Sequence, residues 1–191
     1  IGYMFDDGVH TVYTPILGRA LAERGEEYMR FGAKSVAEVG KPSAMAWYKA
    51  NQVGASYYGY TDLLPLDVQR VVKRTHRMTH ERTPEHYLRY GVFADQPLEQ
   101  IIARTIDLFK QSGKPPTETD LIRAYYHGDA KPLNIWLGGD QPTVFDVPLV
   151  FREDTALYFL QYPTLFITKR SWRRVLYDYL FVRGDDETLY P

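Results

Sequence analysis

The chain has 191 residues, of which 45% are hydrophobic and 25% are charged, and its formal net charge is −1. This length fits one domain with or without an extension, and the composition is that of a chain that buries a core. The small net charge argues against a dedicated nucleic-acid-binding domain, and the lack of cysteine excludes disulfides and thiolate metal sites. The most apolar stretch, residues 144–167, is broken by charges and prolines, so no membrane span is predicted.

The first long element is predicted to be a helix from Pro15 to Val39, after an irregular arm over residues 1–13. Thr14 is suited to cap this helix and Pro15 to occupy its first position, where a missing N–H costs nothing. Three glycines spaced by seven residues fall near one face, which would let another backbone approach closely, although chance spacing accounts for them equally well. These glycines are Gly18, Gly25 and Gly32.

A corner follows this helix. Gly40 and Pro42 stop the helix, and Ser43 can cap a new one that carries a dense aromatic and polar cluster. The members of this cluster are Trp47, Tyr48, Lys49 and Asn51. Such side chains are usually core residues, but they would be anchors at a protein interface, and the sequence leaves both possibilities open.

Most of the remaining chain is also predicted to be helical. The expected helices span residues 44–58, 66–82, 83–93, 96–113, 117–126, 155–162 and 171–182, with Ser171 as a cap for the last. The helix over 96–113 has an apolar stripe that should be buried, and the helix over 117–126 begins with a capping box of Thr117 and Asp120. Residues 135–137 and 143–145 could be short strands. The predicted fold class is therefore mainly α, an elongated helical bundle or hairpin with an irregular, partly extended C-terminal third.

One motif could carry chemistry. His127-Gly128-Asp129, with Asn134 and the later Asp146, resembles the catalytic and magnesium-binding loops of the aminoglycoside and choline phosphotransferase family. The resemblance implies that Asp129 accepts the proton of the substrate hydroxyl and that Asn134 and Asp146 hold magnesium. No phosphate-covering Gly-x-Gly-x-x-Gly loop precedes the motif, and an ordinary turn accounts for it equally simply.

Two further groups of residues could be either functional or simply solvent-exposed. His76 and His80 are four residues apart on a predicted helix and could share a metal ion, but the arginines beside them favour a solvated face. The basic residues between 70 and 82 could contact an acidic partner, although such runs are usually only solvated.

Three segments in order resemble subunit d of the mitochondrial ATP synthase, a protein of the peripheral stalk. These are the helix over 15–39, the corner with its Trp-Tyr-Lys-Ala-Asn cluster, and a later helix at 98–112 that leads to Pro116 and the segment 132–136. The division that follows is an arm over 1–13, a subunit-d-like region over 14–136 and an extension over 137–191. The segment 62–74 also resembles, faintly, a small matrix-side subunit of respiratory complex III.

The resemblance implies a non-catalytic stator subunit without cofactor or metal, on the matrix side of the mitochondrial inner membrane. Its partners would be other peripheral-stalk subunits rather than nucleic acid, contacted through the glycine face and the corner cluster. A missing initiator methionine before Ile1 fits a removed targeting peptide or a longer parent chain.

Overall fold

The computed structural model describes residues 1–18, 26–94, 97–139, 147–161 and 166–183. They fall into two units. Unit 1 comprises Ile1–Val9, Pro132–Val144 and Phe151–Pro191, and unit 2 comprises His10–Lys131 and Phe145–Val150. Each unit contains a parallel sheet of its own.

The centre of unit 2 is a three-stranded parallel sheet in the order β1-β3-β2. Its strands are β1 (Thr11–Leu17), β2 (Val53–Gly59) and β3 (His86–Val92). The register places Tyr13, Arg89 and Ser56 side by side across the three strands. Every residue of β2 is buried, as expected for a strand that has helices on both faces.

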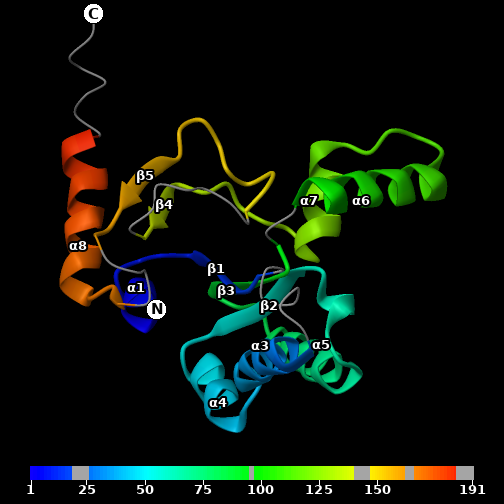
Figure 1. Ribbon diagram of the computed structural model, residues 1–191. Coiled ribbons are helices and arrows are strands. Elements are labelled where there is room, and N and C mark those ends of the chain that lie inside the picture. Colours follow the sequence, from blue (N-terminus) through cyan, green and yellow to red (C-terminus); the bar gives the residue numbers. More distant parts are fainter. Residues whose placement is uncertain (19–25, 95–96, 140–146, 162–165, 184–191) are drawn as a thin grey trace, which may run out of the picture. The chain divides into compact units, whose positions relative to one another are not determined.

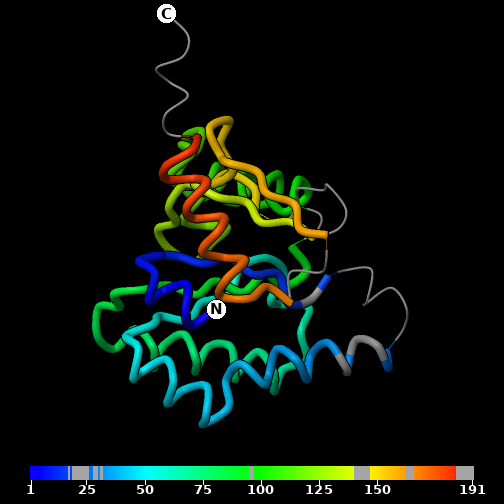
Figure 2. The backbone as a smooth tube through the Cα atoms, turned by 90° about the vertical axis from the view of Figure 1, so that its left-hand side faces the viewer, coloured from blue at the N-terminus to red at the C-terminus, as the bar shows by residue number. Residues whose placement is uncertain are grey.

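Helices cover both faces of this sheet. Three of them, α3 (Glu26–Glu38), α4 (Pro42–Ala50) and α5 (Leu66–Thr79), lie on one face, as Figures 1 and 2 show. On this face the Tyr48 hydroxyl of α4 lies 2.9 Å from the Tyr90 hydroxyl of β3. The 3-10 turn η1 (Thr61–Leu63) links β2 to α5.

The opposite face is covered by α7 (Glu118–Tyr126), which packs beside α6 (Pro97–Ser112). The rings of Tyr125 and Tyr126 pack on Tyr58 of β2, with centroids 6.1 and 5.0 Å away. Tyr126 also meets Tyr13 of β1 edge-on at 5.6 Å. An aromatic layer therefore fixes the end of α7 over the middle of the sheet.

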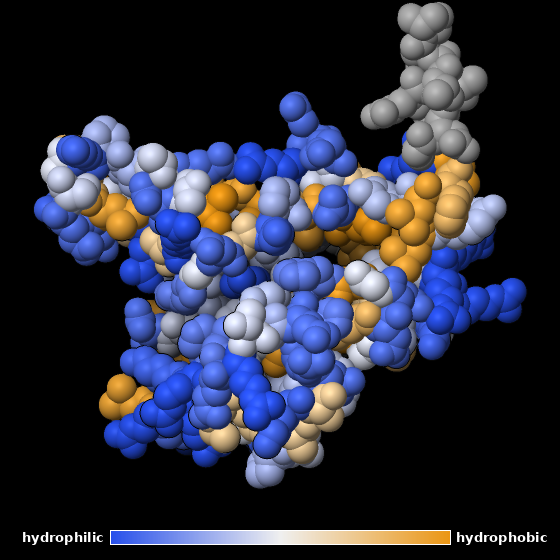
Figure 3. Space-filling model, turned by 180° about the vertical axis from the view of Figure 1, so that it is seen from behind, coloured by the Kyte–Doolittle hydropathy of each residue, from blue (hydrophilic) through white to orange (hydrophobic). Residues whose placement is uncertain are grey.

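Unit 1 contains α1 (Gly2–Asp6), the strand pair β4 (Ile135–Gly138) and β5 (Ala156–Phe159), α8 (Lys169–Tyr177) and the π-helical turn η3 (Asp178–Val182). Asp7 holds α8 beside the first helix, because its carboxylate accepts two charge-assisted bonds from Arg173, at 2.8 and 3.1 Å. The end of α8 and η3 exposes apolar side chains, visible as a patch in Figure 3. They are Tyr177, Leu180, Phe181 and Val182.

The prediction of a mainly α fold is wrong, because the chain folds around parallel sheets. Residues 11–17, 53–59 and 86–92, predicted as arm and helix, are the strands β1, β2 and β3. Strands buried on both faces lack the alternating pattern that identifies half-buried strands, so short apolar runs resemble helix segments. Pro15 lies in an edge strand, where a missing N–H is tolerated, rather than at a helix start.

Several other predictions are confirmed. Helices over 66–82, 96–113 and 117–126 are found as α5, α6 and α7, and β4 includes residues 135–137. The capping box of Thr117 and Asp120 is present, with the Thr117 N–H 2.9 Å from the Asp120 carboxylate. The cap of α8 is Thr168 rather than the predicted Ser171. Residues 143–145 lie outside the described residues.

The apolar stripe of α6 is not buried as predicted. Four of its members are exposed: Leu98, Ile102, Ile106 and Phe109. The stripe satisfies the helical period, but period alone does not say what covers a face. None of the described helices has both the length and the apolar character needed to cross a membrane.

The single helix that was predicted to carry the three glycines is not found among the described residues. Gly18 follows strand β1, Gly25 lies outside the described residues, and Gly32 lies in α3. In the corner cluster, Tyr48 is a core residue with 3% exposure. An interface role for Trp47, Lys49 and Asn51 stays a prediction, as does the division at residues 13/14 and 136/137.

Candidate functional site

Unit 2 contains a cavity of about 420 Å³ whose lining is rich in cations and histidines. The lining comes from the strands, from the end of α5 and from the loop after α7. The residues are His10, Thr11, Ser56, His76, His80, Tyr87, Arg89, His127, Asp129 and Lys131. Four of the five histidines of the chain are among them.

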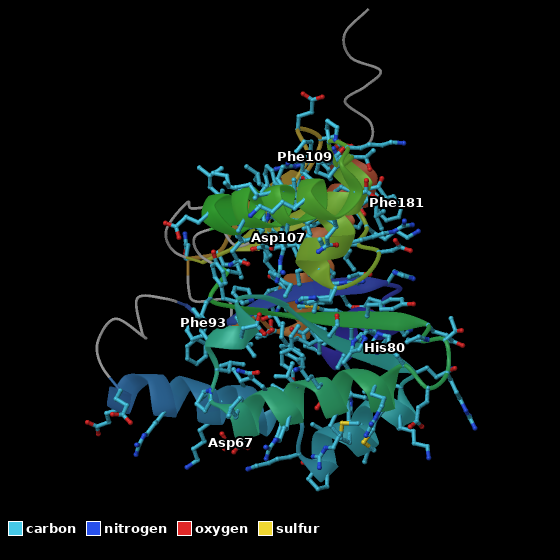
Figure 4. All side chains as sticks on the ribbon, turned by 90° about the vertical axis from the view of Figure 1, so that its right-hand side faces the viewer. Asp67, His80, Phe93, Asp107, Phe109 and Phe181 are labelled. Carbon is cyan, nitrogen blue, oxygen red and sulfur yellow. The ribbon has the colours of Figure 1, made fainter. Side chains whose placement is uncertain are left out.

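The cavity lies toward the amino ends of the strands. Thr11 is the first residue of β1 and Tyr87 is the second of β3. Figure 4 shows His80 and Phe93 at opposite ends of the sheet, and Phe93 directly follows β3. Open α/β sheets usually bind ligands beyond the carboxyl ends of their strands. That other end leads into residues 19–25 and 95–96, which lie outside the described residues.

Arg89 lies at the floor of the cavity and is only 6% exposed. Its guanidinium donates to the backbone carbonyls of Tyr126, at 3.2 Å, and Asp129, and it lies 3.4 Å from the Ser56 hydroxyl. Its Nε is buried without a hydrogen-bond partner among the described residues. Its hydrogen-bond partners among the described residues are neutral groups. The exposed Asp129 carboxylate, which is paired with Arg123, also attracts it, because the charge of Arg89 contributes to the lowered pKa of Asp129.

The wall beside β2 is formed by the last turn of α5. The Thr79 hydroxyl accepts a bond from the Ala55 N–H at 3.0 Å, which fixes the end of the helix along the free edge of β2. The imidazole rings of His76 and His80 stack 4.2 Å apart, and Nδ1 of His80 lies 2.8 Å from the His76 carbonyl. The helix end therefore presents two half-buried histidines to the cavity.

The rim is formed by the loop that follows α7. His127 ends the helix in the left-handed conformation, with φ of 54°, and the chain then turns at Gly128. The Asp129 carboxylate accepts a bond from Arg123 at 2.7 Å, and this exposed ion pair holds the pKa of Asp129 below its ordinary value. The Tyr13 hydroxyl donates to the Lys131 carbonyl at 3.0 Å, which ties the loop to β1.

Most of the titratable groups that line the cavity are positively charged or become so on protonation. Burial lowers the pKa of each lining histidine below its ordinary value, and the positive charge of Arg89 lowers it further. These histidines are His10, His76, His80 and His127. The one carboxylate in the lining, Asp129, is already paired with Arg123. The cavity is thus positive at neutral pH and gains positive charge on acidification.

Of the predicted phosphotransferase site, the structure places only Asp129 in the cavity. Asp129 is paired with Arg123, Asn134 belongs to unit 1 whereas Asp129 belongs to unit 2, and Asp146 lies outside the described residues. Among the described residues, no group of three His, Asp or Glu side chains is placed to hold a metal ion. His76 and His80 instead contribute to the cavity together with His127 and Asp129.

The sequence alone did not identify Arg89, His10 and Lys131 as site residues. Arg89 had a detectable signal, because it interrupts the run Tyr87 to Val92, which is otherwise apolar or aromatic apart from a glycine. The prediction of a helix over this run hid the signal, since an arginine on a helix is ordinarily solvated. His10 and Lys131 lie in separate loops and are brought together only by the fold.

The chain is similar to tuberculosinyl adenosine transferase of Mycobacterium tuberculosis (strain CDC 1551 / Oshkosh), with 31% identity over 186 residues. The alignment covers 94% of this chain, and the chain spans 63% of the length of that relative. No protein-family model matches the chain.

Two solved structures share its fold. Lavandulyl diphosphate synthase from Lavandula x intermedia, in complex with dimethylallyl diphosphate, has a TM-score of 0.75 over 90% of this chain and 76% of its own. A probable undecaprenyl diphosphate synthase from Campylobacter jejuni has a TM-score of 0.75 over 93% and 86%. Each is 14% identical in sequence, so the likeness concerns the fold.

These similarities correct the functional predictions. The resemblance to ATP synthase subunit d is wrong, because the similarity along 94% of the chain is to tuberculosinyl adenosine transferase and the fold is one that two diphosphate synthases share. The non-catalytic stator role, the stalk partners and the mitochondrial location depended on that resemblance and fall with it. The complex III and phosphotransferase alternatives gain no support from the same findings.

Proposed function

We propose that the protein is a prenyltransferase that uses a prenyl diphosphate and transfers the prenyl group to an acceptor of the adenosine type. The observation that carries the proposal is the 31% identity to tuberculosinyl adenosine transferase along 94% of the chain. The fold supports it, because both solved neighbours are diphosphate synthases. A cavity lined by cations also suits a protein that handles diphosphates.

The proposed reaction exchanges one bond for another. The bond between the prenyl carbon and the bridging diphosphate oxygen breaks, and the diphosphate leaves with the electron pair. The same carbon then forms a bond to the acceptor. A protein accelerates such a step by stabilising the negative charge that develops on the leaving diphosphate, and positively charged donors such as arginine and lysine serve this purpose.

The test supplies the protein with dimethylallyl diphosphate or longer prenyl diphosphates, with adenosine as acceptor, in the presence and absence of Mg²⁺. Release of inorganic diphosphate is measured together with the mass of the adenosine product. We expect diphosphate release that depends on adenosine and a product heavier by one prenyl group. A correctly folded protein that releases no diphosphate from any of these donors would refute the proposal.

The product also separates two classes of enzyme. Chain elongation from two diphosphate substrates, with adenosine ignored, would favour a synthase like the two structural neighbours. A prenylated adenosine would favour a transferase like the sequence relative. Because the sequence similarity extends along nearly the whole chain, we expect the second result.

A further inference from the structure

We propose that the cavity around Arg89 is a binding site for a phosphate or diphosphate group, with Arg89 at its floor and Lys131 at its rim. Nothing in the similarity to other proteins assigns this site. It lies toward the amino ends of the strands, whereas sheets of this kind usually bind ligands at the opposite end.

The first argument is the burial of a charge that forms no ion pair among the described residues. Arginine is almost never fully buried unless it is paired, because removing a guanidinium from water is costly. Arg89 is 6% exposed and none of the ion pairs found among the described residues includes it. The chain places this cation in the central strand of the sheet, where an apolar residue would pack without that cost. Such a violation of local preference is expected where function requires it.

A purely structural role explains part of the arrangement. Tyr126 is the last residue of α7, and its carbonyl is one of the groups that a helix end leaves without an internal partner. Arg89 donates to that carbonyl and to the carbonyl of Asp129, so it also helps to cap the helix. Capping leaves the Arg89 Nε–H without a partner among the described residues, although it is buried and belongs to a residue that lines the cavity.

The second argument is the chemistry of the surrounding groups. Donors dominate: Ser56 offers a hydroxyl, Lys131 an ammonium, and the histidines offer ring N–H groups. The carboxylate of Asp129 is engaged by Arg123. Phosphate oxygens accept hydrogen bonds and carry negative charge, so they satisfy both needs of this lining. A neutral ligand would leave the buried guanidinium without an ion-pair partner.

Diphosphate is the expected natural ligand, and in that choice the inference rests on the proposed transferase function. The cavity volume of about 420 Å³ falls within the range of small-molecule sites. Binding is measured without turnover, however, so the two proposals fail separately. Transfer activity without diphosphate binding at Arg89 would refute only this site, and binding without transfer would refute only the function.

The test is isothermal titration calorimetry of the full chain with inorganic diphosphate, and in parallel with dimethylallyl diphosphate. Arg89→Gln is the variant, and Arg70→Gln is the matched control, because Arg70 is exposed on α5 and does not line the cavity. A hydrogen bond to a charged group predicts that Arg89→Gln weakens binding by about 10- to 100-fold, while Arg70→Gln leaves it unchanged. Equal affinity for the two ligands would mean that the diphosphate group alone is recognised.

A second variant protects the test against misfolding. Arg89→Gln removes a helix cap and could unfold α7, whereas Lys131 is exposed and its side chain can be changed without disturbing the core. Lys131→Gln should weaken diphosphate binding several-fold and leave the far-ultraviolet circular dichroism unchanged. Absence of binding to the wild-type chain at millimolar diphosphate, or equal binding by wild type and both variants, would overturn the proposal.

Discussion

The affinity of the Arg89 cavity for an anion should rise as the pH falls. Burial and neighbouring cations hold the pKa of the lining histidines below their ordinary value, so these residues are mainly neutral above neutral pH. A bound anion favours the charged imidazolium and therefore raises those pKa values. Proton uptake must then accompany binding, and by linkage a lower pH strengthens binding.

The size of the effect follows from the charges that face each histidine. Arg89 opposes protonation of all four, Lys131 opposes that of His10, and Arg104 opposes that of His127, which Asp62 favours. The stacked pair from α5, with rings 4.2 Å apart, should take up only one proton, because two adjacent imidazolium ions repel each other. We therefore expect uptake of about one to two protons, and each pKa raised by one unit strengthens binding about tenfold.

Sulfate is the probe for this measurement, because it stays doubly charged from about pH 8 to about pH 6, so that any pH dependence comes from the protein. Calorimetry in two buffers of different ionisation enthalpy gives the number of protons taken up. Arg70→Gln should behave like the wild type. Sulfate binding that is independent of pH, or that releases protons, would refute the role given to the histidines.

Three predictions concern stability and are measured by thermal and urea unfolding. Tyr48→Phe should cost about 1–2 kcal/mol, because it removes the bonds of this hydroxyl to the Tyr90 hydroxyl and the Val39 carbonyl, and no loss would show that the two bonds together contribute nothing. Gly59→Ala should cost about 2 kcal/mol or more, since φ is +90° and the new Cβ would clash with the backbone oxygen of Val92 in β3. The control is Gly113→Ala, which should cost less because its φ of +67° is combined with open space around the new Cβ. Thr117→Ala should cost about 1 kcal/mol by removing the capping box of α7, and an unchanged midpoint would contradict that role.

The sequence allowed good prediction of α6 and α7, although the Thr14-Pro15 signal for a helix start proved wrong. The start of α7 was found from a capping box, and α6 from its proline and its periodic apolar residues. The prediction of the strands failed for a physical reason. In the strand 53–59 all seven residues are buried, so the sequence contains no alternation to detect, and the tyrosines Tyr57 and Tyr58 fit a helix face equally well. The sheet is specified by long-range packing, which no local window contains.

Four of the ten residues that line the cavity were singled out in the sequence: His76, His80, His127 and Asp129. The chemistry first considered for them was metal binding and phosphoryl transfer. The fold brings them to one cavity by joining the end of α5 to the loop after α7. No sequence spacing predicts that juxtaposition, because it depends on both helices packing against the same three strands.

Arg89 belongs both to a strand that was not predicted and to the cavity that only the fold assembles. Once residues 86–92 are known to form the central strand, an arginine in the middle of that strand becomes the exception that needs an explanation. Its bonds to the carbonyls of Tyr126 and Asp129 explain why the residue is tolerated there, since they satisfy two of its five donors. They do not explain why a charge is required, because carbonyl groups at a helix end are also satisfied by neutral donors, water among them. A structural cap and an anion site therefore differ in one measurable respect: only the anion site makes the charge of Arg89 matter for ligand binding when the fold is intact.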